Sequence, residues 1–378
     1  MSSPDGAASW TTTAGGDGVV VAGGVEIPLR NVWLLLLYAS ELYQSGPEAF
    51  DGMEDYPEKL PELLAELLAA STEDRLRRPL TPSFARTSRD LSRVRGGIDT
   101  LRTESHQLLS RGLVACRFDE LTVDTPRNRM IRTALESVAP LCSEEELSRR
   151  CRAQSQRLAS LGVGLLNRRA GERDANVRLT RNDARDRSIL LAAKLALELA
   201  LPSGYMTPGH GRGDLSERQF RHLFERAIGG FYTAHGTGRG WTVQRGRKVD
   251  WKASEATLGL AAVLPHMMTD VWIDDGLRGR RLIIDTKFTS ALSSGRFAKE
   301  TLRSGHLYQL YAYVRAQEAS DPLGASAGGL LLYPAVGTSL AESFVTAGHR
   351  LGAATVDLSL SSVEVRDQLI AAVRPYLG

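Results

Sequence analysis

The stretch from Leu264 to Ser290 constrains this chain more than any other part of its sequence. Residues 267–273 and 281–288 are rich in apolar and β-branched side chains, and an Asp-Asp-Gly sequence begins the polar stretch that separates them. This pattern predicts two antiparallel strands joined by a short turn. The second strand begins with Leu-Ile-Ile, as a buried strand does, and then has Asp285 and Lys287 two residues apart. Side chains at that spacing share one face of a strand, so we expect charged groups where a buried strand ends.

Asp270 on the preceding strand would bring a second carboxylate to this hairpin. Hydrolysis of a phosphodiester needs these groups, because carboxylates hold Mg²⁺ and a lysine steadies the attacking hydroxide. Asp270 followed by Asp285-x-Lys287 is the pattern of the PD-(D/E)xK nucleases. A solvated hairpin with a surface Asp-Lys pair is the alternative. The apolar approach to Asp285 argues against it, because buried charges are rare unless they are paired or bound to metal.

Composition sets the broad class of the protein. The chain has 378 residues, of which 42% are hydrophobic and 24% charged, so we expect a globular protein long enough for two domains. A net charge of +3 is small, so contact with DNA would depend on local arginine clusters. The three cysteines, at positions 116, 142 and 151, have no zinc-site or disulfide spacing. We therefore expect a reducing, cytoplasmic location and, since no apolar run is long enough for a span, no membrane contact.

Changes in composition along the chain suggest its domain organisation. Residues 1–24 have few large apolar groups and are expected to form a disordered leader. A polar, arginine-rich stretch at 167–187 suggests a boundary between an N-terminal domain at 25–180 and a second domain at 181–378. Asn31 is a candidate N-cap for an apolar helix at residues 32–42.

The arginines between residues 75 and 95 leave two readings open. This segment has seven arginines, at positions 75, 77, 78, 86, 89, 93 and 95. They could belong to a solvated loop or to a surface that contacts phosphates or a partner protein. The sequence alone does not decide between them.

The second half of the chain alternates helices and strands around the hairpin. We expect helices at 216–234, 305–317 and 362–377, and strands at 241–251 and 329–334. This order predicts an α/β fold with a central mixed sheet flanked by helices.

Three further side chains are candidates for supporting the hairpin site. Glu225, on the first helix of this half, could complete a metal site or could face solvent. Gln309 and Tyr313 lie one turn apart on the helix after the hairpin. The chain has no Gly-x-x-x-x-Gly-Lys-Ser/Thr motif, so we expect it to bind no nucleotide itself.

Several sequence segments resemble those of a known family and occur in the same order along the chain. They are IPLRNVWLLLLYA from Ile27, RVRGGID at 93–99, ACRFDELTVDTPRNRMI at 115–131, LPHMMTDVWI at 264–273, LIIDTKF at 282–288, HLYQLYAY at 306–313 and GGLLLYP at 328–334. With them the chain resembles the McrC family, the nuclease subunits of McrBC modification-dependent (type IV) restriction systems, from Ile27 to the C-terminus.

The resemblance implies an N-terminal region that docks on a hexameric AAA+ GTPase, McrB, and stimulates it. The region after it would be a PD-(D/E)xK endonuclease domain that cuts double-stranded DNA with Mg²⁺. The catalytic trio would be Asp270, Asp285 and Lys287, with Asp270, Asp285 and the Thr286 carbonyl as metal ligands. Gln309 and Tyr313 match the Gln-x-x-x-Tyr of the RecB-like branch.

The resemblance also limits what this chain is expected to do. Recognition of the modified base, of the 5-methylcytosine type, belongs to the partner in this family, and so we expect no base-flipping pocket here. The position of Glu225 is not reliably acidic in the family, and Thr286, on the far face of its strand, should not disturb the metal. Two alternatives remain, a GTPase-activating adaptor that does not cut DNA and a nuclease subunit of another AAA+ defence system.

Overall fold

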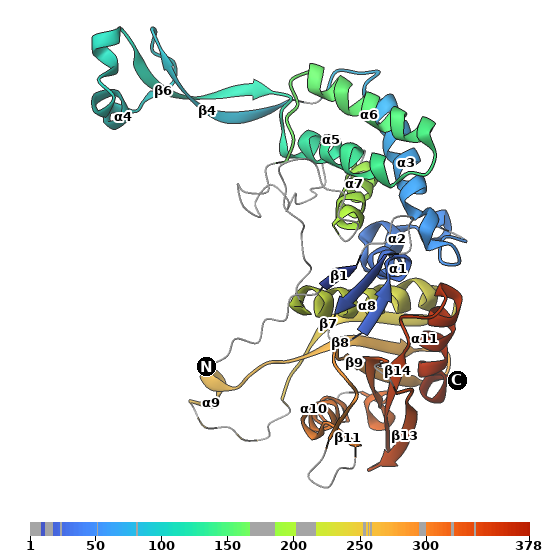
Figure 1. The fold of residues 1–378 in the computed structure, drawn as a ribbon. Coiled ribbons are helices and arrows are strands. Elements are labelled where there is room, and N and C mark those ends of the chain that lie inside the picture. The colour runs from blue at the N-terminus through green and yellow to red at the C-terminus, as the bar shows by residue number, and fades with distance from the viewer. Residues whose placement is uncertain are drawn as a thin grey trace. The chain divides into compact units, whose positions relative to one another are not determined.

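The chain forms two compact units in the computed structural model (Figure 1). Unit 1 comprises Met1–Leu60, Glu198–Met206 and Gly211–Gly378, and unit 2 comprises Pro61–Leu197 and Thr207–His210. The structure describes residues 9–11, 18–22, 25–50, 52–80, 82–166, 186–201, 217–251, 255, 257, 259–294, 300–318, 321–335 and 338–378. Most of the expected boundary segment, residues 167–185, lies outside these ranges.

Unit 1 is built on a six-stranded mixed sheet in the order β13-β14-β12-β9-β8-β7. The strands are β7 (Trp241–Val249), β8 (Met267–Asp275), β9 (Arg280–Thr286), β12 (Gly328–Pro334), β13 (Ala341–Thr346) and β14 (His349–Val356). Strand β12 runs parallel to both β9 and β14, and the other neighbours are antiparallel. The predicted hairpin is the β8–β9 pair. The expected α/β class with a central mixed sheet is confirmed.

Helices cover both faces of this sheet. Helix α10 (Ser304–Arg315) lies on one face, where a Cβ at Gly329 would meet Leu310 and Val314. Helix α11 (Ser362–Leu377) lies on the other face, because a Cβ at the next position, Gly328, would meet Tyr376. Helix α8 (Glu217–Thr237) packs beside α11 and contacts β7, β8 and β9.

The shorter elements of this part of unit 1 connect these helices and strands. They are α9 (Leu260–Val263), β10 (Leu292–Ser294), β11 (Glu300–Leu302) and the 3₁₀ turn Gly324–Ser326.

The N-terminal segment belongs to unit 1, which differs from the predicted domain boundary. Helix α1 (Leu29–Ala39) is apolar on all sides and is buried at ten of its positions, so it needs a packing partner all around. It finds one in α8, where Gly230 allows close approach because a Cβ there would lie 1.8 Å from the Tyr38 carbonyl oxygen. This packing assigns the first sixty residues to the compact unit that contains the sheet.

Two expectations about the N-terminus are wrong. Residues of the expected disordered leader form β2 (Val19–Ala22), which pairs with β3 (Val25–Pro28) and with β1 (Ser9–Thr11). Residues 1–8, 12–17 and 23–24 lie outside the described residues. Asn31 does not cap α1, which already begins at Leu29. Its amide instead donates to the carbonyls of Leu358 and Leu360, at 2.8 and 2.7 Å.

Short helices follow α1 in unit 1. Helix α2 (Glu41–Ser45) begins after Ser40, whose hydroxyl accepts a hydrogen bond from the Tyr43 amide and so caps the helix. Two 3₁₀ turns, Pro47–Phe50 and Pro57–Lys59, complete this region.

Unit 2 combines helices with a β-ribbon. The helices are α3 (Leu60–Arg75), α5 (Pro126–Val138), the 3₁₀ turn Ala139–Leu141, α6 (Glu145–Ser160) and α7 (Arg187–Ala200), which ends in unit 1. In the ribbon, residues 83–122, β4 (Ser83–Leu91) pairs with β6 (Val114–Thr122), and β5 (Gly97–Ile98) pairs with β6 on its other side. Helix α4 (Thr100–Ser105) and the 3₁₀ turn Leu108–Arg111 lie at one end of the ribbon (Figure 1).

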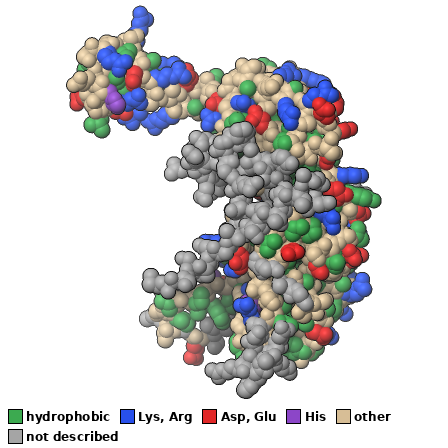
Figure 2. All heavy atoms as spheres, in the orientation of Figure 1, with side chains coloured by type: hydrophobic (Ala, Val, Ile, Leu, Met, Phe, Trp, Pro, Cys, Tyr) green, Lys and Arg blue, Asp and Glu red, His purple; other side chains and the backbone are tan. Residues whose placement is uncertain are grey.

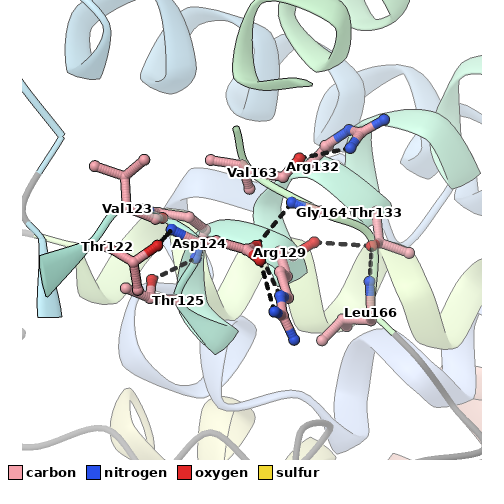
Figure 3. Close-up of polar contacts among 11 residues, drawn as sticks. Thr122, Val123, Asp124, Thr125, Arg129, Arg132, Thr133, Val163, Gly164 and Leu166 are labelled. Carbon is pink, nitrogen blue, oxygen red and sulfur yellow. Dashed lines mark hydrogen bonds and ion pairs between the residues drawn. The ribbon is translucent and has the colours of Figure 1, made fainter. Parts of the chain in front are cut away.

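Asp124 fixes the junction between the ribbon and α5. Its carboxylate accepts hydrogen bonds from Arg129 Nε and Nη2, at 2.7 and 2.6 Å, and from the Gly164 amide at 2.7 Å (Figure 3). The Thr125 hydroxyl accepts the Asn128 amide and caps α5, with proline at the first helical position. The arginine hydrogen bonds hold the pKa of Asp124 below its usual value against the opposing effect of burial. The motif Asp-Thr-Pro therefore joins three segments of unit 2.

The structure of the ribbon bears on the two interpretations of the arginine-rich segment, residues 75–95. Residues 83–91 are a strand, not a loop, and arginine side chains gather on the surface of the ribbon (Figure 2). Large apolar side chains are exposed beside them, including Phe84 at 74%, Leu101 at 79% and Leu109 at 67%. Exposed apolar groups in such number are typical of an interaction surface.

No helix in the described ranges has the length and hydropathy to cross a membrane. The three cysteines are free thiols, and Cys116 and Cys151 are buried.

Candidate active site

Asp285 is a buried carboxylate at the end of a central strand. It lies on β9 between β8 and β12, opposite Leu331, and is 1% exposed. Burial raises the pKa of Asp285 to about 6; the negative charge of Asp270 adds to this, whereas the ammonium of Lys287 opposes it. The carboxylate predicted at the end of a buried strand is thus present, and its surroundings favour the protonated, neutral form.

Lys287 is held by two polar partners. Its backbone amide donates to the Leu332 carbonyl at 2.9 Å, which extends the β9–β12 pairing by one residue. Its ammonium lies 2.7 Å from Asp285 Oδ2 and donates to Gln309 Oε1 at 3.1 Å. The Gln309 amide in turn donates to the Tyr313 hydroxyl at 2.5 Å. The Gln-x-x-x-Tyr pair on α10 therefore reaches the lysine that follows β9.

Asp270 is fixed by Thr286. Its Oδ2 atom accepts the Thr286 backbone amide at 2.6 Å and the Thr286 hydroxyl at 2.7 Å. The register of β8 and β9, with Val271 opposite Ile284, aligns Asp270 with Asp285 where the pairing of the two strands ends. We expected the Thr286 side chain to lie on the far face of its strand, where it would not disturb the metal; in the structure it donates a hydrogen bond to Asp270 and so orients this carboxylate.

Glu225 lies close enough to influence this group of charges. It is on α8, its side chain is 40% exposed, and it contacts His222 at 3.7 Å. Burial raises its pKa, and the charge of Asp270 raises it further. Packing accounts for this position, because the Phe288 ring after Lys287 packs against Phe224 of α8, with centroids 5.7 Å apart. Helix α8 thereby brings Glu225 to the side of the hairpin.

The buried carboxylate fits a divalent cation. Asp285 Oδ2 lies 2.7 Å from the Lys287 ammonium and has no other partner among the described residues, and a buried carboxylate is costly unless cations neutralise it. Among the described residues, no three His, Cys, Asp or Glu side chains form a cluster able to hold a metal by themselves. Mg²⁺ does not need such a cluster, since it is commonly held by one or two carboxylates together with water and substrate phosphate.

One contact near the site was not anticipated from the sequence. His306 on α10 contacts the hydroxyl of buried Tyr333 on β12, with Nδ1 and the oxygen 3.0 Å apart. The pKa of His306 is lowered by burial and then by the charges of Lys287 and Arg303. His306 shares a helix face with Gln309, three residues further along. That spacing is the signal by which the sequence could have predicted that His306 lies near the site.

The fold and the site together define a class. This is an α/β protein whose central mixed sheet brings two aspartates and a lysine together at the end of a hairpin, with a glutamate on the neighbouring helix. Residues 30–334 match the family model described as "McrBC 5-methylcytosine restriction system component". The match spans most of the sequence, and the chain belongs to this family.

Comparison with a curated protein agrees with the family. The chain is 25% identical over 360 residues to the "Type IV methyl-directed restriction enzyme EcoKMcrBC" of Escherichia coli strain K12, covering 93% of this chain and 98% of that protein.

Two solved structures are also similar to parts of the chain. One is described as a half-complex from a tetradecameric assembly of Thermococcus gammatolerans McrB AAA+ hexamers with bound McrC; it has 16% identity, a TM-score of 0.37, and coverage of 82% of this chain and 67% of that one. The other is the T. gammatolerans McrBC complex, with 19% identity, a TM-score of 0.29, and coverage of 44% and 46%.

Proposed function

We propose that this chain is the endonuclease subunit of an McrBC-type system that hydrolyses phosphodiester bonds of modified, 5-methylcytosine-type foreign DNA. One observation carries the proposal: a buried carboxylate, Asp285, lies 2.7 Å from the ammonium of Lys287 at the end of the hairpin, with Asp270 on the strand beside it. This arrangement is costly for folding without a function, because isolating such charges from water removes their hydration.

Asp270 and Asp285 would hold Mg²⁺, with the Thr286 carbonyl as a further ligand. When bound, the cation neutralises charge on the phosphate and lowers the pKa of a coordinated water. Lys287 would orient the attacking water through its ammonium, which Gln309 holds at 3.1 Å. Thr286 would fix the rotamer of Asp270 through its two hydrogen bonds.

The direct test is plasmid cleavage with Mg²⁺, GTP and the AAA+ partner. Asp285→Ala and Lys287→Ala should each reduce cutting by at least about a hundredfold, because each removes a group that acts on the reacting phosphate. Glu342→Gln, on the exposed edge strand β13, is the matched control and should cut normally. Cleavage at the normal rate by either site variant would refute the assignment.

The partner we propose is a McrB-like AAA+ GTPase hexamer, the protein named in the similar Thermococcus assembly. The N-terminal region, expected at 25–180, would dock on it. Within that region the ribbon is the best-suited surface, since it exposes Leu101 and Leu109 beside arginines. Leu101→Ser with Leu109→Ser should weaken stimulation of the partner's GTP hydrolysis, while Leu277→Ser, an exposed leucine in the β8–β9 turn, should not.

A GTPase-activating adaptor without nuclease activity is the alternative. Both proposals predict stimulated GTP turnover, so only DNA cleavage separates them. If the wild-type chain raises GTP turnover but leaves the plasmid whole at every Mg²⁺ concentration, the adaptor is the correct reading.

A further inference from the structure

Strand β7 forms one edge of the sheet in unit 1 and carries an excess of positive charge. From Gln244 to Val249 its sequence is Gln-Arg-Gly-Arg-Lys-Val, with cations at 245, 247 and 248 and no acidic residue. The opposite edge strand, β13, has one glutamate and no cation. The two edges of one sheet therefore differ sharply in charge.

Two of these cations, Arg247 and Lys248, form no ion pair with a carboxylate within the described part of the chain. Most arginines of unit 1 that lie on helices or in the hairpin form ion pairs, as Arg281 does with Asp274 at 2.6 Å. The side chain of Lys248 makes neither an ion pair nor a hydrogen bond among the described residues. Arg245 differs, because burial and the charge of nearby Arg226 lower its pKa whereas the carboxylate of Glu41 opposes this. Arg247 and Lys248 thus concentrate positive potential at the edge.

Arg247 is held in a fixed position beside the candidate active site. Its guanidinium lies over the Trp272 ring, 3.9 Å from the centroid, and donates to Gln244 at 3.4 Å. Trp272 is two residues from Asp270 on β8, and so both side chains lie on one face of the strand. A cation–π contact of this kind fixes the position of an arginine side chain and leaves its charge available to a phosphate.

Glycine in the middle of β7 makes this arrangement possible. Gly246 stands opposite Asp270 in the register, between the pairs Arg245–Val271 and Arg247–Thr269, and has a φ of +59°. A left-handed residue changes the direction of an edge strand, and only glycine takes that conformation without strain. The absence of a side chain also leaves the edge open directly beside Asp270.

We propose that Arg245, Arg247 and Lys248 on β7 contact the phosphates of duplex DNA and guide one strand toward the face of the sheet that carries Asp270 and Asp285. This inference rests on the proposed nuclease function and adds its substrate-contact surface. The occupant is a polyanion because the edge offers three cations within four residues, two of them without an acidic partner, and it is double-stranded DNA because the neighbouring site has the groups for phosphodiester hydrolysis. Phosphate contacts of this kind are independent of base sequence.

The test measures DNA binding separately from cutting. The full chain is titrated onto a fluorescent duplex without divalent cation, and anisotropy is recorded at several salt concentrations. Arg245→Gln with Arg247→Gln and Lys248→Gln should weaken binding at least about tenfold and reduce the slope of log K against log salt by roughly 3, about one for each lost phosphate contact. Arg350→Gln, which removes one exposed cation on β14, is the control for loss of charge away from this edge and should bind like wild type.

Each outcome decides the proposal. Binding and salt slope unchanged in the triple variant overturn it, as does a wild-type chain that fails to bind the duplex at low salt. An equal loss with Arg350→Gln also overturns it, because the effect would then be one of net charge. Thermal melting checks that each variant is folded, and the single variant Arg247→Lys, which keeps the charge, should retain most of the affinity.

The proposed nuclease function can fail independently of this surface. If Asp285→Ala still cuts DNA while the triple variant loses binding, the catalytic assignment is wrong and the binding surface stands.

Discussion

At the scale of single residues, the candidate site depends on how its charged groups are paired. Asp270 is satisfied at Oδ2 by Thr286, and the ammonium of Lys287 lies between Gln309 and the buried carboxylate of Asp285, which it partners at 2.7 Å. The sequence predicted the trio from spacing alone. It could not predict the role of Thr286, because alternation along a strand assigns that side chain to the opposite face.

The Thr286 hydroxyl offers a test of this orienting role. Thr286→Val keeps the shape of the side chain but removes one donor to Asp270, so we expect DNA cleavage to fall by about tenfold, in the range typical of groups that orient metal ligands. Thr286→Ser keeps the hydroxyl and should cut within about twofold of wild type. Cleavage assays with purified variants measure both rates. Equal activity of the valine and serine variants would show that the hydrogen bond does not matter for the reaction.

At the scale of elements, helix–helix and helix–sheet packing determine which segments surround the hairpin. Periodicity predicted the helices at 216–234, 305–317 and 362–377 and the strand at 329–334, and these are confirmed as α8, α10, α11 and β12. Strand β13 and the ribbon strand β4 were missed, because exposed strands carry no apolar alternation to reveal them. Strand β13 pairs with β14, which follows it after two residues, and β4 pairs with β6, which begins only at Val114.

Gly230 tests the packing of α1 on α8. A methyl group at this position would collide with the Tyr38 carbonyl, so Gly230→Ala should lower the free energy of unfolding by about 1–3 kcal/mol despite the higher helix propensity of alanine. Gly238 comes directly after the same helix, in a turn where no atom lies within 4 Å of an added Cβ. Gly238→Ala therefore serves as the control. Urea denaturation followed by circular dichroism measures both. Comparable stability of the two variants would contradict the close approach.

At the scale of the whole molecule, segments distant in sequence share one buried polar cluster in unit 1. Glu54 accepts hydrogen bonds from Tyr43 and from His235 Nε2, the latter at 3.1 Å, and Arg366 lies 3.8 Å from its other oxygen. These residues come from α2, the turn after it, α8 and α11. The cluster ties the N-terminal segment to the C-terminal helix, which agrees with their assignment to one compact unit.

This cluster should make stability depend on pH. Burial raises the pKa of Glu54, but the hydrogen bonds from His235 and Tyr43 outweigh it and lower the pKa below its usual value. A carboxyl whose pKa is lower in the folded state stabilises the protein above its unfolded pKa, about 4.3, and loses that contribution as pH falls through the folded pKa. We therefore expect Glu54→Gln to cost on the order of 1 kcal/mol at pH 7 and progressively less below about pH 4.

Thermal melting across this pH range measures the difference between wild type and variant. Glu58→Gln, an exposed glutamate in the next 3₁₀ turn, is the control and should follow wild type throughout. A constant gap between wild type and Glu54→Gln at every pH would show that the ionised carboxylate of Glu54 is not what stabilises the cluster.

The sequence by itself determined the hairpin, the alternation of helices and strands and the charged trio, because these follow from local periodicity and from the cost of burying charge. The tertiary structure decided which segments surround the trio: the assignment of residues 1–60 to the unit that contains the sheet, the approach of Glu225, the Thr286–Asp270 contact and the basic edge at β7. Those features depend on contacts between residues far apart in the chain, and the free energy of such contacts is set by packing that no local pattern records.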